Sequence, residues 1–107
     1  MDFEELLKEL KSELGQLIEE NFSDFKDAAQ EDVDEFIESS RTKLKRWTGL
    51  LAQGELDREE YSWLLKSQKD LFLMHALKKA GMEKLRLEKL KDGMVDVILD
   101  TAFRVVL

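Results

Sequence analysis

GELDREEYSWLLKSQKDLFLMHALKKAG, residues 54–81, is the stretch that decides how this chain folds. Asp57 followed three residues later by Glu60 is typical of a capping box, in which each side chain accepts a hydrogen bond from the backbone N–H of the other residue. Leu56 and Tyr61 flank the cap, where a hydrophobic staple would fix the angle at which the chain enters the helix. The sequence therefore predicts a helix that begins at about residue 58 and a turn before it.

The residues before this turn carry an apolar repeat that predicts one long helix. Their spacing of three, four and four residues corresponds to about 3.67 residues per turn, which keeps a stripe on one side of a nearly straight helix. The stripe consists of Phe22, Phe25, Ala29, Val33, Phe36, Ser40, Leu44, Trp47 and Leu51. Gly54 follows where a left-handed glycine commonly ends a helix. We therefore expect an antiparallel helical hairpin of residues 23–53 and 57–80 that turns near Gly54.

Further helices are expected at both ends of the chain. Apolar residues alternate in steps of four and three from Phe3 to Leu17, which predicts an acidic amphipathic helix over about residues 3–21. The same spacing resumes at Leu87 and predicts a last helix over about residues 82–104.

Two helix boundaries remain open. Residues 21–24 contain cap-type side chains but neither proline nor glycine, so the first helix either stops there or continues. Gly81 either ends the preceding helix or only kinks it, so the last helix is either separate or continuous. In each case the fold class is all-α, a single domain of residues 1–107 built from long amphipathic helices in a hairpin or bundle.

The amino-acid composition indicates in which cellular compartment the chain is expected. The chain has no cysteine, so it can form no disulfide and no thiolate metal site, which suits a reducing cytoplasm. Its first residues are acidic and lack the basic and apolar regions of a signal peptide. The longest uncharged apolar run, residues 71–77, is far shorter than the roughly 20 residues that a membrane span requires. We expect a cytoplasmic protein without a transmembrane segment.

Charge is divided unevenly along the chain, whose net charge is −7. Residues 1–40 contain 14 acidic and 3 basic side chains, whereas residues 41–107 contain 10 acidic and 14 basic ones. Such halves can neutralise each other within one chain or between two copies. In the expected hairpin, basic segment 78–91 would lie opposite acidic segment 20–33.

The helix after the turn carries more apolar surface than one neighbour can cover. Residues 71–77 are apolar on nearly every side of a helix, so either the first helix folds back over them or another subunit does. We expect a homo-oligomer, a dimer or larger, or a complex with another helical protein. The predicted interface residues are Tyr61, Leu64, Leu65, Leu71, Phe72, Leu73, Met74 and Leu77.

Common metal sites fit the sequence poorly. Aligning Gly54 and Glu60 with a calcium-binding EF-hand loop puts Leu51, which has no side-chain oxygen, at a ligand position. A di-iron carboxylate bundle needs Glu-x-x-His on two helices, but the only histidine, His75, has Phe72 three residues before it.

Catalytic patterns are equally sparse. His75 lies between Met74 and Ala76 and is expected to be a core or interface histidine. No serine lies on a glycine elbow, and no glycine-rich phosphate loop occurs. The acidic run 31–38 is typical of a solvated helix face or a charge partner. We expect no enzymatic activity, no cofactor and no metal.

A basic cluster supports an alternative function. Arg41, Lys43, Lys45 and Arg46 lead into Trp47, and a second cluster spans residues 78–91. Basic residues beside an aromatic ring could hold the phosphates of nucleic acid or of an anionic surface. Because the whole chain is acidic and Trp47 belongs to the apolar stripe, nucleic acid is the less favoured partner. The leading function is a non-enzymatic structural or adaptor module that binds itself or another helical protein.

Overall fold

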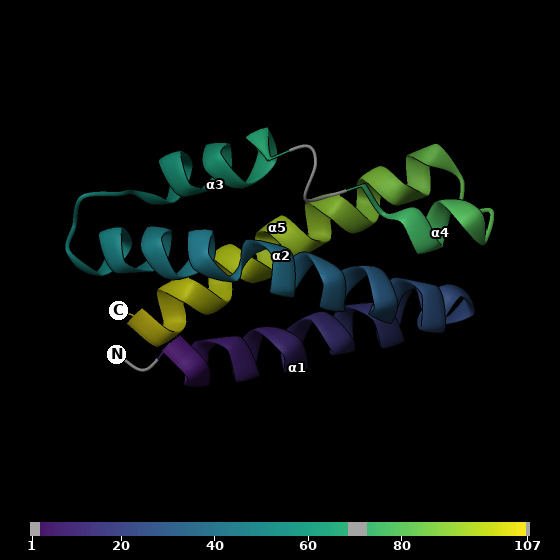
Figure 1. The fold of residues 1–107 in the computed structure, drawn as a ribbon, viewed down its shortest axis with the longest axis horizontal. Helices are drawn as coiled ribbons and strands as arrows, with labels where there is room; N and C mark the ends of the chain where they lie inside the picture. The colour runs from purple at the N-terminus through teal and green to yellow at the C-terminus, as the bar shows by residue number, and fades with distance from the viewer. Residues whose placement is uncertain (1–2, 69–72, 107) are drawn as a thin grey trace.

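The computed structural model describes residues 3–68 and 73–106 and confirms the all-α class. No strand occurs within these residues (Figure 1). The elements are α1 (Phe3–Asn21), a short 3₁₀ helix η1 (Ser23–Phe25), α2 (Lys26–Ala52), α3 (Arg58–Ser67), α4 (His75–Lys79) and α5 (Lys84–Val106).

The three long helices form the body of the molecule. Helix α1 packs along α5 and α2, whereas α3 lies on α5 and α2, and α4 lies on α2. In Figure 1, α2 runs between α1 and α3, and the two ends of the chain lie at the same end of the bundle. At Gly93 of α5 an added Cβ would come within 3.2 Å of the Leu17 side chain, so a small residue lets α1 and α5 approach closely.

The break left open at residues 21–24 is present. Helix α1 ends at Asn21, and η1 leads into α2, which then runs without interruption to Ala52. Of the predicted stripe, Phe25 is partly buried and the others are buried: Phe22, Ala29, Val33, Phe36, Ser40, Leu44, Trp47 and Leu51. The eleven-residue repeat therefore identified the buried side of α2.

The turn after α2 has the geometry of a glycine cap. Gly54 has φ +76°, in the left-handed region that glycine adopts without steric cost. The Glu55 N–H donates to the Leu50 carbonyl at 2.9 Å, and the Gly54 N–H donates to the Leu51 carbonyl at 3.1 Å. These two bonds satisfy carbonyls that the end of the helix leaves open.

The predicted capping box is confirmed at the start of α3. The Glu60 N–H donates to Asp57 Oδ1 at 2.8 Å, and the Asp57 N–H donates to Glu60 Oε1 at 3.1 Å. Leu56 and Tyr61, the residues of the expected staple, are both buried. Local sequence chemistry therefore sets where α3 begins.

The prediction of one helix over residues 57–80 is wrong. Helix α3 ends at Ser67 and α4 begins only at His75, after Met74 in the left-handed conformation with φ 54°. The start of α4 is capped by Asp32 of α2, which is 5% exposed. Its Oδ1 accepts from the Ala76 N–H at 2.9 Å, and its Oδ2 accepts from the Leu77 N–H at 2.8 Å. These N–H groups are free only because a new helix starts there.

Helix α4 stops at a second glycine cap. Gly81 has φ +91°, and its N–H donates to the Lys78 carbonyl at 3.1 Å. The Met82 N–H donates to the Leu77 carbonyl at 3.1 Å, which completes a Schellman motif. The last helix is therefore separate from α4 and begins at Lys84.

Ion pairs connect helices that are distant in sequence. Arg86 of basic segment 78–91 reaches Asp24 of acidic segment 20–33 with two hydrogen bonds of 2.5 and 2.6 Å, as the charge pattern predicted for these segments. This guanidinium lowers the pKa of Asp24. At the other end of the bundle, Arg104 of α5 pairs with Glu9 and Glu13 of α1 at 3.2 and 3.5 Å. These exposed pairs fix helix register more than they add stability.

None of the helices within residues 3–68 and 73–106 combines the length and apolar character needed to cross a membrane.

We predict that Asp32→Ala destabilises the protein by about 3 kcal/mol, because it leaves two helix N–H groups without an acceptor in a buried place. Asp34→Ala is the matched control, since Asp34 is exposed on the same helix and its carboxylate accepts from the Gln30 side chain at 2.9 Å. The control should change the free energy of unfolding by no more than about 0.5 kcal/mol. Urea denaturation measures both, and equal effects of the two substitutions would contradict the assigned role of Asp32.

Candidate interaction surface on helix α3

The predicted interface residues divide between core and surface. Tyr61, Leu65, Met74 and Leu77 are between 0% and 4% exposed, within the core of the chain itself. Leu64 is partly buried, Leu73 is 38% exposed, and residues 71 and 72 lie outside the described residues. The four buried side chains are therefore covered within one chain. Self-association itself stays a prediction.

Tyr61 fixes α3 against α2. Its hydroxyl lies 3.0 Å from the Thr48 hydroxyl, and its ring meets Trp47 edge to face with centroids 6.1 Å apart. Burial raises the pKa of Tyr61 to about 12, and the bond to Thr48 offsets part of that rise. With Tyr61 turned into the core, the opposite face of α3 must point toward solvent.

Trp63 occupies that outward face and is 67% exposed. A groove of about 460 Å³ runs beside it, lined by Leu56, Asp57, Glu59, Glu60, Trp63 and Leu64. The groove thus has apolar walls and three carboxylates, and none of the described residues that line it is basic. The sequence interpretation missed Trp63 because it followed only the inward stripe. The available signal was its position two residues after Tyr61, which places the two side chains on opposite sides of a helix.

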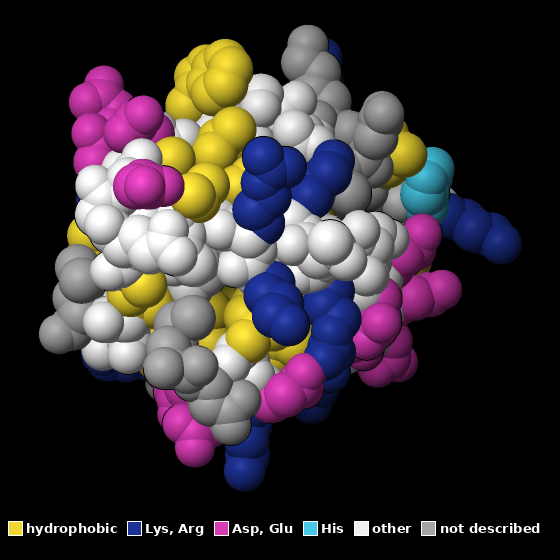
Figure 2. All heavy atoms as spheres, turned by 60° about the vertical axis from the view of Figure 1, so that its left-hand side comes forward, with side chains coloured by type: hydrophobic (Ala, Val, Ile, Leu, Met, Phe, Trp, Pro, Cys, Tyr) yellow, Lys and Arg dark blue, Asp and Glu magenta, His cyan; other side chains and the backbone are white. Residues whose placement is uncertain are grey.

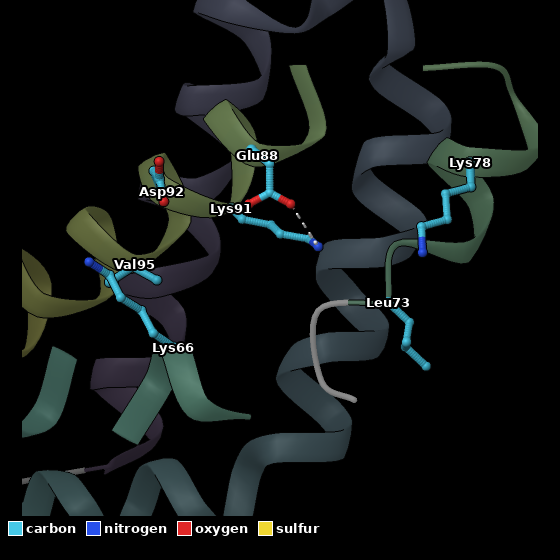
Figure 3. Close-up of a pocket in the computed structure, with 7 residues that line it drawn as sticks. All are labelled: Lys66, Leu73, Lys78, Glu88, Lys91, Asp92 and Val95. Carbon is cyan, nitrogen blue, oxygen red and sulfur yellow. Dashed lines mark ion pairs between the residues drawn. The ribbon is translucent and has the colours of Figure 1, made fainter. Parts of the chain in front are cut away.

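A second hollow lies where α3, α4 and α5 meet. Its volume is about 490 Å³, and Lys66, Leu73, Lys78, Glu88, Lys91, Asp92 and Val95 line it. In Figure 3 the Lys66 side chain rises beside Val95, whereas Lys78 extends down toward Leu73, so their ammonium groups do not meet at one point. Lys91 pairs with Glu88 at 3.6 Å. Three lysines therefore border the hollow together with the carboxylates of Glu88 and Asp92, without the convergent donors of a phosphate site.

Charge is segregated on the surface as well as along the sequence. Figure 2 turns the left-hand side of Figure 1, where α3 begins, toward the viewer. Lys and Arg side chains gather at the centre of this face with hydrophobic side chains between them, and Asp and Glu side chains lie toward its edges. Such a face is complementary to a surface on which the charges are likewise separated.

The first basic cluster is partly engaged. Arg41 forms an ion pair with Glu4, and Lys43 Nζ donates to Gln68 Oε1 at 2.6 Å, whereas Lys45 and Arg46 are exposed. Trp47 is only 7% exposed, so it presents no ring face on which a base could stack. The four basic residues therefore lie at the surface, whereas Trp47, the aromatic residue expected beside them, lies in the core.

His75, expected in the core or at an interface, is exposed at the start of α4, so it is not in the core, and an interface position stays a prediction. The helix break moved it from the middle of a buried helix to an end. It lines a hollow of about 50 Å³ with Asp32 and Ser39, and no hydrogen bond joins Ser39 to His75 among the described residues. It also lines a hollow of about 430 Å³, whose carboxylates are those of Asp27, Glu31, Asp32 and Glu35. Within residues 3–68 and 73–106, no three His, Cys, Asp or Glu side chains are grouped to hold a metal ion.

Models of protein families, curated proteins and solved structures were compared with the chain, and none of them matches it. The candidate surface is therefore defined by residues of this chain alone, namely the outward face of α3 around Trp63.

The buried tyrosine predicts a loss of stability in alkali. Burial raises the pKa of Tyr61 from 10.0 to about 12 in the folded chain. The contribution of the neutral phenol to folding stability is therefore fully present below pH 10 and is lost as the pH rises toward 12. A shift of this size corresponds to about 2–3 kcal/mol. Thr48→Val should raise the pKa further, because the threonine hydroxyl stabilises the phenolate. Tyrosinate absorbance reports this directly, since Tyr61 is the sole tyrosine. If the Tyr61 phenol titrates near pH 10 while circular dichroism shows that the chain is still folded, the hydroxyl is not buried.

Proposed function

We propose that this chain is a non-enzymatic structural or adaptor module that acts through the outward face of α3. It binds the surface of another protein, either a second copy of itself or another helical protein. The observation that carries this proposal is Trp63, a large aromatic side chain left 67% exposed beside an apolar groove.

The exposure of Trp63 contrasts with the packing beneath it. Tyr61 and Leu65 on the other side of α3 are each 1% exposed, so the helix is already anchored without the tryptophan. Tryptophan is enriched at the centres of protein interfaces, where its large area leaves water on association. Trp63 therefore supplies free energy for binding that folding does not use.

The groove indicates what kind of segment would bind. Leu56 and Leu64 give it apolar walls, and the carboxylates of Asp57, Glu59 and Glu60 surround them. Cationic side chains next to apolar ones would satisfy both features. An amphipathic helix with basic flanks is thus the best partner for this groove.

A second candidate function is binding of nucleic acid or an anionic surface. Segment 78–91 supports it better than Arg41–Arg46 does. Its lysines Lys78, Lys79, Lys84 and Lys89 are exposed and form no ion pair with any described residue. We favour a cytoplasmic setting for either function, which the absence of cysteine suits.

The proposal is tested by NMR on the indole N–H signals of the two tryptophans, assigned with Trp63→Phe. We expect a synthetic amphipathic helix with lysine flanks to shift the Trp63 signal and to leave that of buried Trp47 in place. A peptide with the same apolar face and glutamate flanks is the control and should bind far more weakly, because it meets three carboxylates. If neither peptide, nor a rise in the concentration of the protein itself, perturbs Trp63, α3 is not an interaction surface.

A further inference from the structure

The outward face of α3 carries an acidic side chain near its beginning and a basic one near its end, so two copies of this face could pair in opposite directions. Glu59, Trp63 and Lys66 are separated by four and three residues, so they follow one line along the helix. All three are exposed. Neither Glu59 nor Lys66 forms an ion pair with a described residue, so both charges remain available to a partner.

We propose that two copies of this chain associate through α3, packed antiparallel about a two-fold axis that passes near Trp63. This inference rests on the proposed function and names the partner as a second copy. In the antiparallel arrangement, Glu59 of each copy faces the partner's Lys66, and the two Trp63 side chains pack against each other. A two-fold axis makes every contact occur twice, as is usual in homodimers.

The antiparallel direction follows from the charges around the stripe. The beginning of α3 is acidic, with Glu59 and Glu60 in its first turn, whereas Lys66 lies in its last turn. Beyond that end, Lys78 and Lys91 border the hollow of about 490 Å³ together with Glu88 and Asp92, so the unpaired cation that α3 itself supplies is Lys66. An antiparallel pair brings Glu59 of one copy to Lys66 of the other, whereas a parallel pair would oppose like charges.

The size of the surface sets the expected strength. Helix α3 has 10 residues, which corresponds to a length of about 15 Å. A contact of this length buries less than the roughly 1,200 Å² of a standard interface, so we expect a weak dimer with a dissociation constant in the micromolar range or above. Because its charged pairs are exposed, added salt should weaken it.

Sedimentation velocity across a concentration series tests the arrangement through charge reversal. Glu59→Lys and Lys66→Glu should each weaken dimerisation about tenfold or more, because one substitution disrupts two symmetric contacts. An equimolar mixture of the two variants should regain the dimer, since each opposite-charge contact re-forms between unlike chains. The chain with both substitutions should also dimerise, and Trp63→Ala should not.

The matched controls are Glu5→Lys and Lys8→Glu, which reverse the same charges on exposed positions of α1, on the far side of α2 from α3 in Figure 1. These variants should dimerise like the unmodified chain, and circular dichroism verifies that every variant is folded. The inference would be overturned by any of three results. The chain stays monomeric at millimolar concentration, the charge reversals on α3 leave the dimer unchanged, or the mixture of the two variants fails to restore the dimer. If the chain is monomeric but Trp63 still responds to the basic peptide, the proposed function stands with a different partner.

Discussion

The rest of the structure depends on one buried carboxylate, that of Asp32. Its two oxygens accept hydrogen bonds from the backbone N–H groups of Ala76 and Leu77 at 2.9 and 2.8 Å, and the residue is only 5% exposed. An anion at the first turn of a helix satisfies donors that the helix itself cannot, and it also interacts favourably with the helix dipole. This contact fastens α4 to the middle of α2 and caps α4 as a helix that begins at His75, separate from α3.

The break has consequences for both neighbouring helices. Leu77 of α4 reaches the core and is fully buried, and the Gly81 cap then turns the chain into α5, which returns along α1. On the other side, α3 becomes a short helix held by Tyr61 against α2, with Trp63 facing outward. Within the apolar stretch that suggested an oligomer, Met74 and Leu77 are buried inside the chain and Leu73 is exposed, whereas the outward face of α3 exposes Trp63.

The sequence predicted what local chemistry controls. The heptad spacing marked α1, the eleven-residue repeat marked the buried side of α2, and Asp57 with Glu60 marked the start of α3. It failed between α3 and α4 because apolar periodicity continues through that segment, and the decisive acceptor lies 44 residues away from Ala76. A contact of that separation leaves no trace in spacing or propensity, and the position of His75 was missed for the same reason.

Native-state amide hydrogen exchange at Ala76 and Leu77 tests this account most directly. Both amides lie in the first turn of a helix of 5 residues, where no carbonyl of that helix can accept from them. If Asp32 holds them, they should be protected about as well as the amide of Leu44, which belongs to a fully buried position of α2. Exchange of Ala76 and Leu77 at the rate of an exposed chain, with Leu44 still protected, would show that the Asp32 contact does not organise the fold.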